Sequence, residues 1–392
     1  MSQEKTITVP SVQIQKAPVE RLTQGNGHYF FGYYDMAAFD INGKYHLYHK
    51  VDFMDRLPTA KDVAELGMIE IASRRSIRIA ETTAWNFQQG AMFQWNPARP
   101  DQEVVYNVRD GNSYRAIIHD VKTSRERRLE MPVAAIDSRG RYALSINFSR
   151  VFDFRPGYGY AGMADINRNC KSPEDDGIFL IDMTTGKGRL IMSLQKINEL
   201  LWDTRSIVKN GRLVINHISF NTDGSRLIAF VRNIPVPGKP WGTALITADA
   251  DGANVYVLSD YRMSSHYHWR DETHLLIYAE HRQDNQLYLL RDKSQDCEIV
   301  DREFFRADGH CSYSPDRKRI LYDSYPQSNY RHLYVYDLEG HTGADLASFY
   351  SDPVSTGDIR CDLHPRWHPD GRMVSFDSTH ERRRHIYMAQ IA

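Results

Sequence analysis

The sequence predicts an all-β fold, a seven-bladed β-propeller with four-stranded blades. One pattern recurs seven times along the chain: a large apolar or aromatic residue, a turn that ends in Asp-Gly or an equivalent, and an alternating apolar strand. Most copies are followed by a second strand that ends in an acidic turn, which leaves room for four strands in each repeat. Hydrophobic residues make up 41% of the chain and aromatic residues 11%, enough for an ordered core.

The spacing of the seven copies along the chain is typical of propeller blades. Three of the six intervals, of 41, 49 and 44 residues, match the ~40–50 residues of a propeller repeat, and two more, of 56 and 54 residues, are slightly longer. The longest, between Ile136 and Phe220, predicts an insertion at about 150–210 that holds the only convincing helical stretch, "SLQKINELLWDTR". The copies are "FDINGKYHLY" from Phe39, "WNPARPDQEVVY" from Trp95, "IDSRGRYALSI" from Ile136, "FNTDGSRLIAF" from Phe220, "WRDETHLLIY" from Trp269, "YSPDRKRILYD" from Tyr313 and "WHPDGRMVSFD" from Trp367.

The last copy leaves room for only three strands. A ring that stays open exposes a bare sheet edge, so we expect an N-terminal strand to supply the fourth, from either "KTITVPSVQI" or "VERLTQG". Residues 1–392 are therefore expected to form a single domain with no interdomain linker.

Charge and composition argue against several classes of partner. Lys and Arg number 49 against 50 Asp and Glu, so no global field attracts nucleic acid or an anionic membrane. No apolar run approaches the ~20 residues of a membrane helix, and the N-terminus lacks a secretory pattern. Four cysteines without a CxxC pair indicate reduced thiols. We expect a cytoplasmic monomer or homodimer, without a nucleic-acid or membrane partner.

Four successive copies carry a histidine three residues before the aromatic residue: His217, His266, His310 and His364. In such repeats these residues begin the innermost strand, so the four imidazoles are predicted to converge on one mouth of the central channel. Neutral imidazoles can bind a divalent cation or exchange protons near pH 7. The alternative is that repeat duplication placed them and that each bonds to a neighbouring blade.

A carboxylate accompanies this set. Asp362 lies two residues before His364, so both side chains point to the same side of the strand. Two or three histidines with a carboxylate suit Mn, Zn, Fe or Ni. The first three copies carry Met36, Met92 and Val133 at the same position. We find no P-loop, no GxGxxG after a strand, no GxSxG and no HExxH, which argues against nucleotide-dependent and serine-hydrolase chemistry.

Three segments carry a family resemblance. "LHPRWHPDGRMVSFDSTHERRRHIYMAQI", with "SSHYHWRDETHLLIYAE" and "GHCSYSPDRKRILYD", resembles the bacterial oligogalacturonate lyases. The resemblance is best over 215–392 and implies a cytoplasmic seven-bladed propeller that cleaves short pectic oligouronides by β-elimination. It also implies a divalent metal in the channel mouth, Mn first, with Zn and Ca as alternatives.

The resemblance places the metal ligands on His266, His364 and Asp362, where the carboxylate replaces one of the family's imidazoles. The family's glutamine ligand falls on Ile359, which cannot coordinate a metal. Its basic arginine falls near Asp176 and Gly177, so the base is missing at the expected place.

The remaining roles follow from the chemistry of removing a proton next to a uronate carboxylate. His217 or His310 is predicted to be the base. A guanidinium binds a carboxylate through two parallel hydrogen bonds, which makes Arg150, Arg232 and Arg360 candidate clamps. Candidate acids for the leaving group are Tyr158, Tyr160, Tyr33 and Tyr34, and candidate contacts to the sugar are Gln88, Gln89, Tyr34, Asp35 and His28.

Two other functions stay open on the same predicted scaffold. One is a glycoside hydrolase that uses histidine or aspartate as acid and base. The other is a non-catalytic propeller of the TolB or WD type that binds a glycan or a protein. The fold by itself does not decide among the three.

Overall fold

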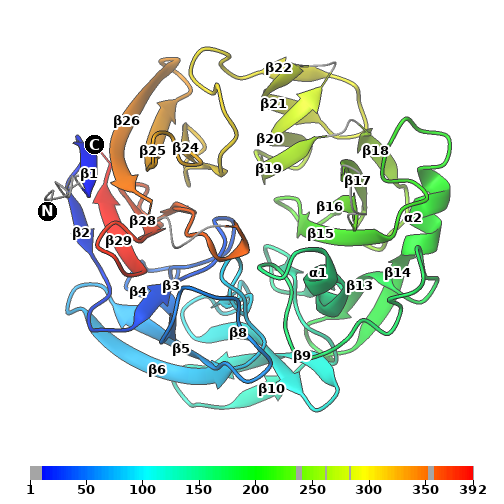
Figure 1. The fold of residues 1–392 in the computed structure, drawn as a ribbon, viewed down its shortest axis with the longest axis horizontal. Helices are drawn as coiled ribbons and strands as arrows, with labels where there is room; N and C mark the ends of the chain where they lie inside the picture. Colours follow the sequence, from blue (N-terminus) through cyan, green and yellow to red (C-terminus); the bar gives the residue numbers. More distant parts are fainter. Residues whose placement is uncertain (1–10, 235–240, 261–262, 282–283, 352–356, 392) are drawn as a thin grey trace, which may run out of the picture.

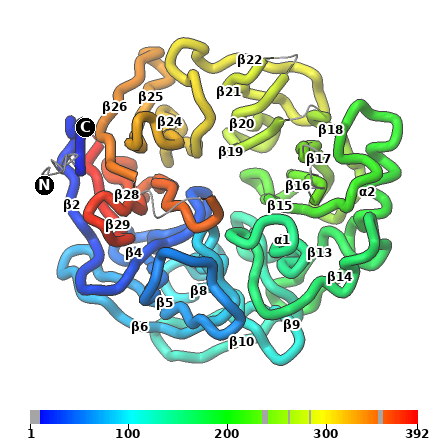
Figure 2. Tube along the Cα trace, in the orientation of Figure 1, coloured from blue at the N-terminus to red at the C-terminus, as the bar shows by residue number. Residues whose placement is uncertain are grey.

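Seven antiparallel sheets stand around a central axis in the computed structural model of the chain (Figure 1). The structure describes residues 11–234, 241–260, 263–281, 284–351 and 357–391. The chain passes around the ring once, from blue to red in Figure 2, and the first and last of its described segments lie at the same side of the ring. The predicted seven-bladed propeller with four-stranded blades is therefore confirmed.

Within a blade the strands run from the channel outward in sequence order. The first three blades are β3 (His28–Phe30), β4 (Tyr45–Val51), β5 (Ala64–Glu70) and β6 (Arg75–Thr82); β7 (Gln94–Trp95), β8 (Glu103–Asp110), β9 (Ser113–Asp120) and β10 (Glu126–Arg128); and β11 (Ala135–Ile136), β12 (Tyr142–Ser145), β13 (Gly177–Asp182) and β14 (Gly188–Ser193).

The fourth and fifth blades are β15 (Leu213–Phe220), β16 (Arg226–Asn233), β17 (Thr243–Asp249) and β18 (Tyr256–Ser259); and β19 (Ser264–Trp269), β20 (His274–His281), β21 (Asp284–Arg291) and β22 (Cys297–Ile299). The sixth and seventh are β23 (Cys311–Tyr313), β24 (Arg319–Asp323), β25 (Tyr330–Asp337) and β26 (Thr342–Tyr350); and β27 (Arg366–Trp367), β28 (Met373–Ser378) and β29 (His385–Gln390). Apolar side chains of neighbouring blades, such as Leu333 and Phe376, pack into shared clusters, so the core lies between the blades.

Two N-terminal strands close the ring. β2 (Val19–Arg21), from "VERLTQG", pairs with β29 and completes the seventh blade as its outermost strand. β1 (Val12–Gln15), from "KTITVPSVQI", pairs with β26 and adds a fifth strand to the sixth blade. Residues 5–10 of that segment lie outside the described residues. The predicted N-terminal closure is confirmed, and both candidate segments take part in it.

Two short helices interrupt the third-to-fourth blade region, within the predicted insertion. α2 (Leu194–Leu200) begins where "SLQKINELLWDTR" predicts a helix, because the Ser193 side chain accepts a hydrogen bond from the Lys196 amide. α1 (Phe148–Phe154) is an addition to the prediction, and Asn147 caps it in the same way. None of the described helices has both the length and the apolarity needed to cross a membrane.

The inner edge of the first blade sends a loop into the channel. Phe30 pairs with His49 and Phe39 with His46, so the residues between Phe30 and Phe39 outnumber those of the partner strand and must leave the sheet. This loop, 31–38, has the sequence "FGYYDMAA", and its buried Tyr33 and Tyr34 pack against histidines of the fourth, sixth and seventh blades. The loop therefore lies inside the channel and separates its two mouths from each other.

Candidate functional site

Irregular backbone surrounds three of the four predicted histidines. In β15 the register shifts between Ile215 and Ile218, and in β19 it shifts between Ser264 and Tyr267. His217 and His266 lie in these bulges, which free a side chain from the ordinary pleat and re-aim it. His364 precedes β27 with a φ of 42°, a left-handed conformation that non-glycine residues seldom adopt.

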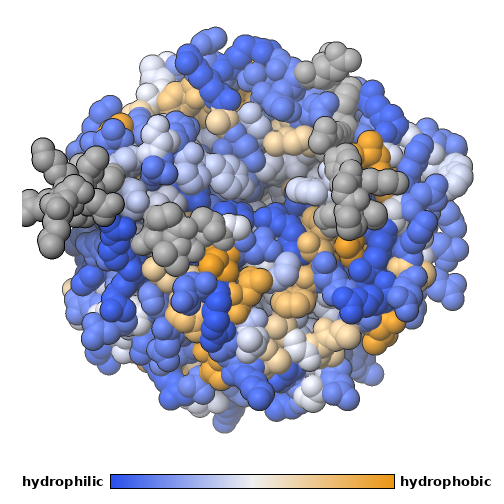
Figure 3. Space-filling view, in the orientation of Figure 1, coloured by the Kyte–Doolittle hydropathy of each residue, from blue (hydrophilic) through white to orange (hydrophobic). Residues whose placement is uncertain are grey.

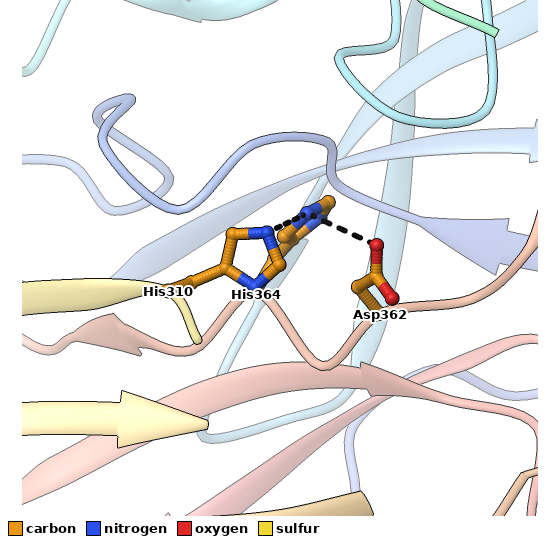
Figure 4. Close-up of side chains that lie close together, drawn as sticks. All are labelled: His310, Asp362 and His364. Atoms are coloured by element: carbon orange, nitrogen blue, oxygen red, sulfur yellow. Dashed lines mark hydrogen bonds and ion pairs between the residues drawn. The ribbon is translucent and has the colours of Figure 1, made fainter. Parts of the chain in front are cut away.

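Three of the predicted residues form a compact group, His310, Asp362 and His364. Their ligand atoms all lie within 4.8 Å of one another, and all three residues are buried. The two Nε2 atoms are 3.1 Å apart, and Nε2 of His364 is 3.9 Å from a carboxylate oxygen of Asp362 (Figure 4). Histidine nitrogens and a carboxylate at such distances are the donor set of a divalent-cation site.

Asp323, at the end of β24, orients this group. Its carboxylate lies 2.9 Å and 3.0 Å from Nδ1 of His310, and it accepts hydrogen bonds from the backbone amides of His310 and His364. If the hydrogen of His310 is on Nδ1, toward Asp323, its Nε2 presents a lone pair toward His364. A carboxylate behind a ligating histidine is the common arrangement in metal sites, because it fixes the ring and its tautomer.

The charges in the group match a cation ligand set. Burial lowers the pKa of His310 and of His364 well below the ordinary value, so both rings are neutral at pH 7. Burial by itself raises the pKa of Asp362, but the guanidiniums of Arg360 and Arg331, both 2.6 Å from its oxygens, hold that pKa well below its usual range. The residues therefore fit a divalent metal, with two neutral nitrogens face to face and an ionised carboxylate beside them.

His266 stands beside this group and contacts it. Its ring centroid is 3.8 Å from that of His310, its Nδ1 is 3.0 Å from Asp308, and its Nε2 is 3.5 Å from the Tyr325 hydroxyl. The predicted ligands were His266, Asp362 and His364. In the structure, the three residues whose ligand atoms lie close together are His310, Asp362 and His364. Of the four histidines, His266 is the one that both contacts this group and lines the open cavity described next.

A cavity of about 840 Å³ opens at the same mouth of the channel. Hydrophilic residues gather in the central hollow on the face that Figure 3 shows. The walls come from the third to the seventh blades and their connections. The charged, titratable and aromatic side chains that line the cavity are Phe154, Arg155, Tyr158, His217, Arg232, Trp241, His266, Asp308, Tyr325, Asp358 and Arg360.

Arg232 is a buried cation that faces this cavity. Its guanidinium contacts the amide oxygen of Asn216, the hydroxyl of Thr243 at 3.1 Å and a backbone carbonyl at 3.3 Å. No carboxylate within the described parts of the chain pairs with it. Burial, and then the charge of Arg155, lower the pKa of Arg232 to about 10, yet it stays cationic at pH 7. A buried, unneutralised guanidinium is a strong attractor for a carboxylate.

His217 forms the inner wall of the cavity. Its ring stacks on Tyr33, with centroids 4.9 Å apart, and its Nε2 is 3.4 Å from the Tyr33 hydroxyl. Nδ1 lies 3.3 Å from the side-chain nitrogen of Gln89. Burial, followed by the charge of Arg232, lowers the pKa of His217 well below its ordinary value. The imidazole is therefore neutral and can accept a proton.

Tyr158 is held between two guanidiniums at the cavity wall. Arg360 donates to its hydroxyl at 2.7 Å, and the Arg155 guanidinium lies 4.2 Å from the centre of its ring. Gln88 supports this wall from behind, because its amide donates to the backbone carbonyls of Asp358 and Arg360. The structure thus brings Tyr158 and Arg360 to the cavity and keeps Gln88 outside it.

Several predicted site residues lie elsewhere. Arg150 is 1% exposed and its guanidinium contacts Asp165 and four backbone carbonyls, so it cannot reach a substrate. The Tyr160 hydroxyl accepts from Asn107, and its ring stacks on a buried phenylalanine. Both residues belong to the interior and not to the cavity, because their polar atoms already have protein partners.

The tyrosine-rich loop is only partly involved. The Tyr34 hydroxyl donates to the carbonyl of Tyr267 and accepts from its amide, so it holds the loop to the fifth blade. Asp35 lies toward the opposite mouth of the channel. His28 begins β3, where its Nδ1 accepts from the Arg384 amide, and it does not line the cavity.

Asp308, Asp323, Tyr325 and Arg331 are among the residues of this region that the sequence did not predict. One of them left a signal, because Asp308 lies two residues before His310 as Asp362 lies two residues before His364. Asp323, Tyr325 and Arg331 occupy no repeated position near a histidine. They reach the site through the folding of β24 and β25, which the spacing along the chain does not reveal.

The fold has solved relatives. One, an oligogalacturonate lyase in complex with manganese, superposes with a TM-score of 0.70 at 15% identity, over 98% of this chain and 97% of its own. An oligogalacturonate lyase from Vibrio parahaemolyticus gives 0.66 at 15% identity, over 97% and 96%. The β-propeller domain of the Trilobed protease from Pyrococcus furiosus gives 0.53 at 9% identity, over 93% and 96%.

These likenesses concern the fold. At 15% identity they confirm the predicted resemblance to the oligogalacturonate lyases as a distant one, over nearly the full chain. No protein-family model matches the sequence, and no curated protein matches it.

Proposed function

We propose that the protein is a lyase that cleaves uronate-containing oligosaccharides by β-elimination in the cavity at the histidine-lined mouth. The observation that carries the proposal is the charge layout of one cavity. Arg232, a buried cation without a carboxylate partner among the described residues, lines it, and His266, which also lines it, contacts the group of His310, Asp362 and His364. Such a cavity favours an acidic ligand.

The difficult step is removal of the proton next to a carboxylate, because the resulting charge must be stabilised. Arg232 is suited to bind that carboxylate and to spread the charge that develops on it. His217, which lies on the same wall, is neutral and is our candidate for the base. The carbon–hydrogen bond breaks as the proton moves to the imidazole. Its electron pair forms the new double bond, and the bond between the neighbouring carbon and the leaving oxygen breaks with its electrons on that oxygen.

The leaving oxygen needs a proton. Tyr158 lines the cavity with its hydroxyl bonded to Arg360, which stabilises the phenolate left after proton donation. The broad cavity and its aromatic walls, Tyr158 and Trp241, suit the flat apolar faces of sugar rings. The volume of about 840 Å³ lies within the range of small-molecule sites and suits a short oligosaccharide.

A divalent metal fits the mechanism. His310, His364 and Asp362 would hold it, and His266, which contacts His310, lines the cavity beside them. When bound, such an ion supplies positive charge that neutralises the uronate and stabilises the developing enolate-like anion. The solved oligogalacturonate lyase of the same fold is a manganese complex, which makes Mn our first choice.

The direct test is incubation of the purified protein with short oligouronides, with Mn²⁺ added. We expect an increase in the ultraviolet absorbance of an unsaturated uronate product. Release of reducing ends without that absorbance would instead indicate hydrolysis. If the protein bound the oligouronide but released neither product, it would be a non-catalytic glycan-binding propeller.

A further inference from the structure

A second opening leads to His217 from the opposite mouth of the channel. A cavity of about 310 Å³ lies at that mouth, and Asp35 is among its lining residues. Between it and the large cavity lies a small one of about 20 Å³. His217 lines both the large and the small cavity, and Asp35 lines both the small cavity and the far one. The three spaces thus follow one another along the channel.

The small cavity is built to hold water. Its volume is sufficient for one molecule, which needs two to four polar partners. Gln89, Asn216, His217 and Asp35 supply them. Asn216 is 1% exposed, its oxygen accepts from Arg232, and its side-chain nitrogen has no partner among the described residues. A buried amide donor without a partner is costly, and a water molecule in this cavity would satisfy it.

We propose that Asp35 and a water molecule in the small cavity carry protons between His217 and the far mouth of the channel. The inference rests on the proposed function, in which His217 takes a proton from the substrate. While substrate or product fills the near cavity, His217 cannot exchange protons with solvent on that side. The back route lets the imidazolium lose its proton to the water as Asp35 takes one from that water.

The direction of transfer agrees with the surroundings. Asp35 is exposed to the far cavity, yet it lies deep inside the ring, and burial raises its pKa to about 6. Burial lowers the pKa of His217 well below its ordinary value, so its proton passes readily to the carboxylate. The other titratable or charged groups that face Asp35 or share its cavity wall are Tyr33, Tyr34, His266, Tyr267, His268, Cys311 and Arg317.

The test uses the full-length protein loaded with Mn²⁺ and an oligouronide substrate. For D35N we expect kcat to fall about tenfold with an unchanged KM, because Asp35 acts through His217 and does not touch the substrate. In the wild type kcat should rise with pH through about 6, as the carboxylate ionises and can accept a proton. This rise of kcat with pH should be absent in D35N and present in D35E.

Chemical rescue separates a proton route from a structural role. Formate, small enough for the far cavity, should raise kcat of D35N and leave the wild type unchanged. S138A serves as the control, since Ser138 lines the far cavity and not the small one, and it should match the wild type.

Two outcomes overturn the inference in distinguishable ways. If the wild type is active and D35N has the same kcat and the same pH profile, there is no relay through Asp35, and the proposed function still holds. A wild type that yields no unsaturated product removes the proposed function, and the relay with it. A high-resolution crystal structure checks the water independently, and a small cavity without a water bonded to Asn216 would contradict the relay.

Discussion

Two pairs of buried histidines in this molecule differ in their surroundings, and only one pair has the features of a site. In the first blade, His46 and His49 are buried, and burial lowers the pKa of each to about 3. Both nitrogens of His46 contact protein partners, the Leu47 carbonyl at 2.6 Å and the Ser375 hydroxyl at 2.8 Å. His310 and His364, equally buried, instead direct their Nε2 atoms at each other beside a carboxylate. Burial and a lowered pKa are common to both pairs, so the direction of the nitrogens is what distinguishes a candidate site.

The buried arginines show the same contrast. Arg150 is enclosed by Asp165 and backbone carbonyls, whereas Arg232 faces the cavity without a carboxylate. Accordingly, the large cavity is lined by the third to seventh blades and their connections, and none of its lining residues comes from the first two. The comparison predicts that substitutions of enclosed residues such as Arg150 and His46 change stability. Substitutions of residues at the cavity or in the histidine group, such as Arg232 and His364, should change activity.

The largest effect on stability is expected from R150M. It leaves Asp165 buried with fewer positive partners, and breaking a buried ion pair costs about 3–5 kcal/mol. Urea unfolding monitored by circular dichroism measures the change. R168M is the matched control in the same insertion, because the Arg168 side chain is 64% exposed and its pair with Asp153 should contribute at most ~1 kcal/mol. Equal losses in the two variants would contradict the assignment of Arg150 to the interior.

The largest effect on activity is expected from H364N. Loss of one ligand should remove the bound metal and reduce kcat/KM by about 100–1000-fold, the range seen when charge stabilisation is removed from an active site. Elemental analysis of the purified variant gives the metal content, and the unsaturated product gives the activity.

H332Q provides the histidine control for that experiment. His332 is partly buried in β25, where it pairs with Asp345 outside the cavity. We expect full metal content and activity in H332Q. If H364N kept its metal and its activity, the group of His310, Asp362 and His364 would be structural like His46.

A smaller loss is expected from R232M. A hydrogen bond to a charged group contributes about 1.5–3 kcal/mol, so kcat/KM on an oligouronide should fall about 10–100-fold, while the urea midpoint changes far less than in R150M. R232K should recover part of the activity. The control is R270M, which removes a half-exposed arginine that pairs with the adjacent Asp271. Normal activity in R232M, on a substrate that the wild type cleaves, would exclude Arg232 as the carboxylate partner.

The effect that is smallest at neutral pH is a dependence of stability on pH that arises from the structural histidines. The folded-state pKa of His46 and of His49 is about 3, below the ~6.5 of an unfolded chain. Between these values the unfolded chain binds more protons, so the free energy of unfolding should be constant above pH 7 and fall as pH falls from 6.5 toward 3. Urea midpoints at several pH values measure the slope.

H49Q tests whether these residues cause the slope. His49 Nε2 accepts a hydrogen bond from the Ala91 amide, and a glutamine oxygen can accept it as well. The variant should therefore lose about one proton of the pH dependence and keep its fold. An unchanged slope would mean that other groups dominate the acid response.

The sequence by itself determined the architecture of the fold and the depth in the channel at which the site lies. Seven large apolar or aromatic positions with their turns establish seven blades, and the missing fourth strand of the last blade requires a strand from the N-terminus. A shared position in the repeat also identifies His217, His266, His310 and His364 as residues near one mouth. Repetition carries this information because the same register places a residue at the same depth in every blade.

Only the tertiary structure decided which of these side chains meet. Register gives depth along the channel, but the direction of a side chain depends on bulges, on left-handed residues such as His364, and on neighbouring blades. That is why His310 and not His266 groups with Asp362 and His364, and why Arg150 and Arg232 have opposite surroundings. Closure of the ring sets these contacts, because it brings residues far apart in the sequence to one axis.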